Sequence, residues 1–136
     1  MTLKITLLSL FLTLTTYSTL QAQSEVIQEE KVMKNTGLLR HVVLFQFKKG
    51  TSSEKIKEIE AAFHELPSKI SEIYSYEWGL NNSPENLNKN FTHCFFLTFQ
   101  SEADRATYLP HPDHKAFGAL LTPFLEDVLV VDYWVK

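Results

Sequence analysis

Apolar and polar positions along most of this chain alternate in blocks that predict strands and helices. Residues 39–47 are rich in β-branched and aromatic side chains on both faces, which is typical of a strand that is covered on both sides. Over residues 51–70, apolar side chains recur every three or four positions, which predicts an amphipathic helix. Thr51 and Glu54 form a capping-box pattern at its start, and Pro67 should end or kink it.

The second half of the chain continues this pattern. Strands are predicted at 73–80, 91–99 and 128–135, with a short helix beginning at Ser101 and a further helix capped by Asp113. The order is β-α-β-β-α-β, so we predict an α+β, ferredoxin-like fold with a four-stranded antiparallel sheet and helices on one face. The other face should be apolar and need a partner. We expect the aromatic residues of the middle strands at that interface: Tyr74, Tyr76, Trp78, Phe91, Phe95 and Phe99.

The N-terminus predicts a secretory signal peptide at residues 1–22. Lys4 precedes an apolar run, and small polar residues then lead to Ala22. The run is shorter than the about 18–20 apolar residues of a spanning helix, so we expect a periplasmic or extracellular protein with no stable membrane insertion after cleavage. Residues 23–37 are charged and predict a flexible leader, which leaves 38–136 as the folded domain.

Composition narrows the classes of partner. The net charge is −3 and becomes −4 when Lys4 is removed with the signal, and the basic residues are scattered, so no nucleic acid is expected. Cys94 is the single cysteine, which excludes an intramolecular disulfide and a cysteine-based zinc site. The partner is therefore expected to be a small molecule or a protein.

Residues 108–114 bring a tyrosine and two histidines together, and such side chains move protons near neutral pH. His41 and His93 occupy strand faces of matching phase, so both can point into one cavity if their strands are neighbours. The alternative is that these histidines bind backbone carbonyls, and His111 between two prolines is expected to fix the loop. No helical His-x-x-x-His pair occurs and no carboxylate is obviously in register, so neither a metal nor another cofactor is predicted.

Five segments together resemble the stress-responsive A/B barrel family across nearly all of residues 38–136. They are His41-Val-Val-Leu-Phe-Gln-Phe-Lys48, Glu77-Trp78-Gly79, Thr92-His93, Tyr108-Leu-Pro-His111-Pro-Asp-His114 and Asp132-Tyr133. The resemblance implies a dimeric α+β barrel, in which two sheets close back to back across a homodimer interface.

The plant polyketide cyclases of this family imply residue roles. Their essential tyrosine and histidine fall on Tyr108 and His114, and their pocket histidines fall on His41 and His93. Their apolar lining falls on Val43, Phe45, Ile59, Phe63, Phe95, Phe117, Gly118, Leu125 and Val130. Phe63 and Leu125 replace a tyrosine and a tryptophan, so the cavity and its substrate can differ. In such a site His114 is the general base, and Tyr108 hydrogen-bonds the oxygen that gains charge.

Three hypotheses follow from these patterns. The first is an exported barrel that binds a small apolar or aromatic molecule, and the second is a cofactor-free cyclase or lyase that uses His114 and Tyr108. The third is a non-catalytic structural or stress-response dimer whose cavity is filled by phenylalanine rings. A polyketide thioester is not expected as the substrate, because such thioesters are made in the cytoplasm and the signal peptide predicts export. Cavity volume is the feature that separates the hypotheses.

Overall fold

The computed structural model describes residues 19–30 and 36–136, and the chain divides into two compact units, Met1–Thr36 and Gly37–Lys136. In the first unit, residues 19–30 form a helix with exposed side chains, which the sequence pattern did not predict. Most of the predicted signal peptide lies outside the described residues. Within the part of the chain that is described, no helix is both long and apolar enough to cross a membrane.

The second unit is built on one antiparallel sheet. Its strands are β1 (Leu39–Phe47), β2 (Ser75–Leu80), β3 (His93–Phe99) and β4 (Leu125–Trp134), in the order β2-β3-β1-β4. β1 and β3 are the two central strands, and both carry apolar residues on both faces. The predicted α+β fold with a four-stranded antiparallel sheet is confirmed.

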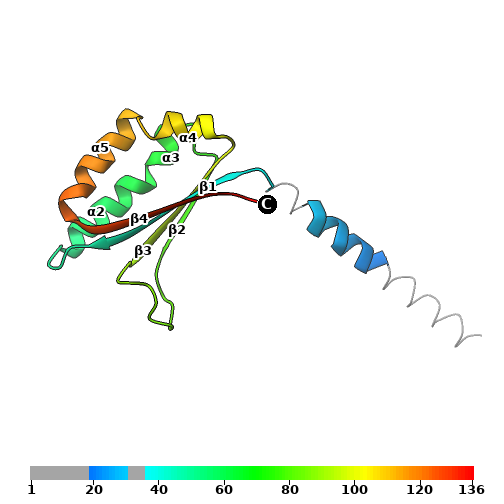
Figure 1. The fold of residues 1–136 in the computed structure, drawn as a ribbon, viewed down its shortest axis with the longest axis horizontal. Coiled ribbons are helices and arrows are strands. Elements are labelled where there is room, and N and C mark those ends of the chain that lie inside the picture. The colour runs from blue at the N-terminus through cyan, green and yellow to red at the C-terminus, as the bar shows by residue number, and fades with distance from the viewer. Residues whose placement is uncertain (1–18, 31–35) are drawn as a thin grey trace, which may run out of the picture. The chain divides into compact units, whose positions relative to one another are not determined.

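The helices lie together on one side of this sheet (Figure 1). They are α2 (Ser53–His64), α3 (Leu66–Lys69), α4 (Glu102–Tyr108) and α5 (Pro112–Leu121), and a 3₁₀ turn, η1 (Thr122–Phe124), precedes β4. Pro67 divides the predicted first helix, since α2 ends before it and α3 begins beside it.

Two predicted helix caps are wrong by one or two residues. Ser52 caps α2, because its hydroxyl accepts a hydrogen bond from the Lys55 N–H at 3.2 Å. The hydroxyl of Thr51 instead donates to the carbonyl of Lys48. His111 rather than Asp113 caps α5. Neighbouring polar residues can each serve as a cap, so the backbone conformation decides between them.

The hydrophobic core lies between the helices and the sheet. The rings of Phe63 on α2 and Phe95 on β3 are stacked with centroids 4.1 Å apart, and Phe45 on β1 lies 4.9 Å from Phe95. Phe95 and Phe99 are completely buried in this layer. The prediction that Phe95 and Phe99 belong to the dimer interface is therefore wrong, because strand alternation turns these two rings toward the helices.

The opposite side of the sheet, which we call the outer face, is apolar and bare in the single chain. It consists of Val42, Leu44, Cys94, Phe96, Leu129, Val131 and Tyr133. On β4, Leu129, Val131 and Tyr133 are each 44–45% exposed. An apolar sheet face of this kind is the surface that a partner would cover.

Candidate functional site

A cavity of about 390 Å³ lies between the β1–β4 half of the sheet and helices α4 and α5. Most of its wall is apolar, and its polar side chains come from the strand pair and from the two helices. The lining residues are His41, Val43, Phe45, Phe63, Tyr108, Leu109, His114, Phe117, Gly118, Leu121, Leu125, Val128, Val130 and Asp132. We call the group formed by His41, Tyr108, His114 and Asp132 the polar end of the cavity.

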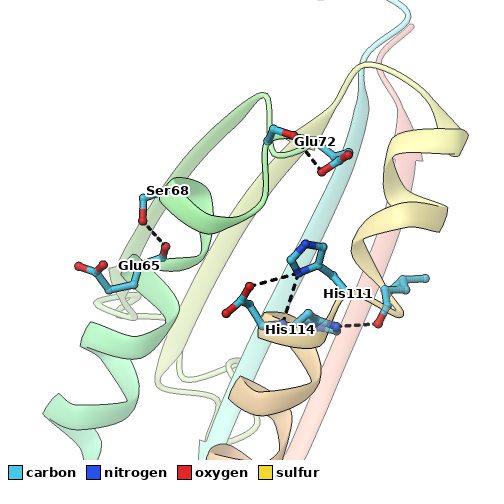
Figure 2. A network of polar contacts seen from close by, with 8 residues as sticks. Glu65, Ser68, Glu72, His111 and His114 are labelled. Atoms are coloured by element: carbon cyan, nitrogen blue, oxygen red, sulfur yellow. Dashed lines mark hydrogen bonds and ion pairs between the residues drawn. The ribbon is translucent and has the colours of Figure 1, made fainter.

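Tyr108 and His114 are brought together by the break between two helices. Tyr108 is the last residue of α4, and His114 lies in the first turn of α5, so the chain between them folds back. Their ring centroids are 4.3 Å apart. Nδ1 of His114 lies 2.9 Å from the backbone carbonyl of Leu109 (Figure 2). A carbonyl only accepts hydrogen bonds, so Nδ1 carries the hydrogen and a neutral His114 keeps its lone pair on Nε2.

His41 belongs to a chain of polar contacts that runs from β1 through β4 to α4. Its Nδ1 lies 2.6 Å from Oδ1 of Asp132, and Oδ2 of the same carboxylate accepts a 2.8 Å hydrogen bond from Arg105. His41 and Asp132 are directly paired in the β1–β4 register, which places both side chains on one face.

Sequence reasoning assigned no role to Asp132 or Arg105. The available signal was that Asp132 is the one charged residue in the otherwise apolar segment 128–135. Arg105 gave no comparable signal, because an arginine on a short helix is ordinary. Only the pairing of β1 with β4 and the position of α4 connect Arg105 to His41.

Burial sets the protonation of the polar end. Burial lowers the pKa of His41, although the hydrogen bond and negative charge of Asp132 partly oppose this, so His41 is neutral at neutral pH. Burial also raises the pKa of Tyr108, which therefore stays a hydrogen-bond donor. Tyr76 has the only buried side-chain N or O atom without a partner among the described residues. In the described part of the chain, Nε2 of His41 and the hydroxyl of Tyr108 have no hydrogen bond, and both side chains line the cavity.

The structure does not bring His93 to this cavity. Its Nε2 lies 2.9 Å from Glu60 of α2, and its Nδ1 lies 2.8 Å from the hydroxyl of Thr92. His93 pairs with Phe45, four residues from His41 along β1, which is about 13 Å. Alternation had placed the two histidines on one face, but it does not fix their position along the strands.

The apolar residues predicted to line the cavity also fall into two groups, those that line it and those that do not. Val43, Phe45, Phe63, Phe117, Gly118, Leu125 and Val130 line the cavity, whereas Ile59 and Phe95 lie in the core outside its lining. His93 and Cys94 instead line a separate hollow of about 470 Å³ beside the loop between β2 and β3.

His111 lies beside the site but serves the helix. Its Nδ1 accepts a hydrogen bond from the Asp113 N–H at 3.3 Å and so caps α5 (Figure 2). Within residues 19–30 and 36–136, no group of three or more His, Cys, Asp and Glu side chains is arranged to hold a metal ion.

Comparison with known proteins identifies the family. The family model described as "Stress responsive A/B Barrel Domain" matches residues 39–135, which is the whole sheet and its helices. The chain belongs to the stress-responsive A/B barrel family. The stress-response A/B barrel domain-containing protein HS1 of Arabidopsis thaliana is 39% identical over 97 residues, which cover 71% of this chain and 89% of that protein. Olivetolic acid cyclase of Cannabis sativa is 26% identical over 95 residues, which cover 70% of this chain and 94% of the cyclase.

Solved structures of similar fold include an enzyme and a dimer. The hydroxynitrile lyase of Passiflora edulis superposes with a TM-score of 0.69 at 28% identity, covering 73% of this chain and 94% of the lyase. A dimeric protein with a ferredoxin-like fold from Bacteroides fragilis superposes with a TM-score of 0.60 at 30% identity, covering 73% of this chain and 97% of that protein. The predicted resemblance to the family, including its cyclase, is confirmed.

Proposed function

We propose that this protein is a homodimer whose subunits each bind a small apolar or aromatic molecule in the cavity beside His41, Tyr108 and His114. The observation that carries the proposal is the volume of the cavity, about 390 Å³, which lies within the range of small-molecule pockets. Phe45, Phe63 and Phe117 form its walls and leave this space open. The open space argues against a structural dimer with a filled interior.

The homodimer is supported by the outer face and by the dimeric relatives. The apolar side chains of the outer face are only half-buried in one chain, and a second copy would remove them from water. Solved structures of similar fold are described as dimeric, among them the one from Bacteroides fragilis.

The second candidate function is a cofactor-free lyase or cyclase. The observation that favours it is the pairing of Tyr108 with His114 at 4.3 Å between ring centroids, with Nδ1 of His114 held by a carbonyl. His114 Nε2 would remove a proton from a hydroxyl or from a carbon beside a carbonyl. Tyr108 would donate to the oxygen that gains negative charge. Family relatives named as a cyclase and a lyase support this class of reaction.

The binding proposal is tested by titrating benzyl alcohol into the purified protein while recording amide NMR spectra. Shifts confined to the residues that line the cavity are expected. Shifts spread over the surface, or none at millimolar ligand, would reject the cavity as a binding site.

The catalytic candidate is tested separately with an aromatic hydroxynitrile as substrate, followed by the release of the aldehyde. If His114 and Tyr108 act as proposed, His114→Ala and Tyr108→Phe should each lose about 100-fold or more in rate, the usual contribution of a general acid or base. His64→Ala, on the exposed surface of α2, is the matched control and should keep the wild-type rate. Binding without any turnover by the wild-type protein would count against this reaction.

Export is proposed from the pattern of residues 1–22 alone. Expression in a bacterium with its native N-terminus, followed by intact mass measurement of the envelope and extracellular fractions, should give a chain that begins at Gln23. Recovery of the uncut chain in the cytoplasm would contradict the proposal.

A further inference from the structure

The lining of the cavity contains one ionised side chain, and the positively charged side chain that pairs with it lies outside the lining. Asp132 lines the cavity, whereas Arg105 is absent from the lining and contacts the carboxylate of Asp132 at 2.8 Å. The two oxygens of Asp132 are thereby divided between partners, Oδ2 to Arg105 and Oδ1 to His41. Arg105 is therefore paired with Asp132 outside the lining of the cavity.

We propose that Asp132, itself held by Arg105, orients His41 with its hydrogen on Nδ1 and its acceptor on Nε2, so that the cavity selects neutral ligands with a hydroxyl group over the corresponding carboxylates. This inference rests on the proposed function, since it names the ligand class of the same cavity. It assigns positioning roles to Arg105 and Asp132, which act on the ligand through His41.

The hydrogen-bonding capacity of the polar end supports this ligand class. The carboxylate of Asp132 accepts from Nδ1–H of His41, which leaves the lone pair on His41 Nε2. The carbonyl of Leu109 has the same effect on His114. The polar end thus presents two acceptor nitrogens and one donor, the hydroxyl of Tyr108. A hydroxyl group can donate to one acceptor and accept from Tyr108, whereas a carboxylate cannot donate at all.

The groups that surround His41 disfavour the binding of a ligand carboxylate. Asp132 approaches it from β4, Arg105 and Tyr108 from α4, and His114 from α5, while Phe99 of β3 packs edge-on against its ring. A ligand carboxylate would meet the negative charge of Asp132 and two lone pairs with only one donor available. An unpaired anion in such a partly desolvated place is costly.

Arg105 opposes the effect of Asp132 on the pKa of His41. Burial is the largest cause that lowers the pKa of His41, and the charge of His114 lowers it further. The positive charge of Arg105 also lowers it, whereas the hydrogen bond and negative charge of Asp132 raise it. The two neighbours therefore act on His41 with opposite signs. This opposition gives a test that does not depend on any ligand.

The test is a pH titration of the protein labelled with ¹⁵N in its histidines, followed by the ring nitrogen shifts of His41. In the wild type, His41 should be neutral at pH 7 with the hydrogen on Nδ1. Arg105→Met should raise the pKa of His41, and Asp132→Asn should lower it, because each removes one of the two opposing charges. Arg105→Lys retains the positive charge and should restore the wild-type value. Asp127→Asn, on the same strand, is the matched control for lost negative charge.

The titration overturns the positioning roles of Arg105 and Asp132 if His41 carries its hydrogen on Nε2 or is protonated at pH 7 in the wild type. Shifts of the same sign in Arg105→Met and Asp132→Asn would also overturn it, since a general loosening of the fold would move both alike.

The ligand preference is measured with benzyl alcohol and benzoate, which share the aromatic ring. We expect benzoate to bind about tenfold or more weakly, which corresponds to about 1.4 kcal/mol. In Asp132→Asn the difference should shrink, because Arg105 is released to meet the anion. Equal binding of both probes to the wild type would overturn the inference and leave the proposed function standing. Binding of neither probe would reject the proposed function, while the histidine titration would still decide the role of Arg105 and Asp132.

Discussion

Single hydrogen bonds decide the chemistry of the polar end. His41 and His114 have the same side chain, but the first is held by a carboxylate and the second by a backbone carbonyl. Both partners accept from Nδ1, so the two rings keep their acceptor nitrogen on the same atom, Nε2. His93 differs because both of its nitrogens are engaged, by Thr92 and Glu60.

The buried His41 should make stability depend on pH. Burial lowers its pKa below the value of about 6.5 in the unfolded chain. Between the folded and unfolded pKa values the unfolded chain binds more protons, so the free energy of unfolding falls as pH decreases below about 6.5. His41→Asn cannot titrate and should lose this part of the pH dependence. Urea unfolding at pH 7.5 and 5.5 measures it, with the exposed His64→Asn as the control. An unchanged pH dependence in His41→Asn would contradict the assignment.

Among the structural elements, β3 and α2 meet in the core through a stacked pair of aromatic rings. Phe95 and Phe63 stack at 4.1 Å, and Phe45 and Phe117 complete an aromatic cluster around them. Phe95 has no exposed surface, so its ring is a core contact between sheet and helix and does not report on dimer formation.

Phe95→Ala should therefore lower the free energy of unfolding by about 3–5 kcal/mol, the cost of removing a buried aromatic ring and leaving a cavity. Chemical denaturation at a fixed protein concentration measures the loss. Tyr74→Ala, whose side chain is 49% exposed just before β2, should cost about 1 kcal/mol or less. Similar losses in the two variants would mean that Phe95 is not the packing centre described here.

At the scale of the whole molecule, the outer face is the feature that one chain leaves incomplete. Its β1 and β4 residues pair directly, Val42 with Val131 and Leu44 with Leu129, which gives a continuous apolar strip on one side of the sheet. Arg40 lies over the ring of Phe96 at 5.4 Å, so a charged side chain borders this strip.

Val131→Lys should convert the proposed dimer into a monomer at micromolar concentration, because it would bury a charge in the contact between two copies. Val131 is 45% exposed in the single chain, so the subunit itself should remain folded. Light scattering coupled to size exclusion measures the mass, and circular dichroism checks the fold. Ala119→Lys, on the exposed side of α5, should leave the dimer intact. A wild-type monomer, or a dimer that survives Val131→Lys, would place the interface elsewhere.

The sequence by itself determined which segments of residues 38–136 form strands and helices. Periodicity and β-branched content are local properties, so β1 was predicted with its observed bounds and with apolar residues on both faces. The short motif at 108–114 also brought Tyr108 and His114 to attention, because a helix break keeps residues six apart in contact.

Tertiary structure decided what lies beside these residues. Strand register places His41 opposite Asp132 and leaves His93 four residues away with Glu60, and no local pattern contains that information. The side of the sheet that the helices cover likewise turned Phe95 and Phe99 into core residues. Register and layer packing are fixed by contacts between segments far apart in the chain, where a shift of one residue exchanges the two faces. The histidine, the carboxylate and Arg105 therefore become one group only in the folded chain.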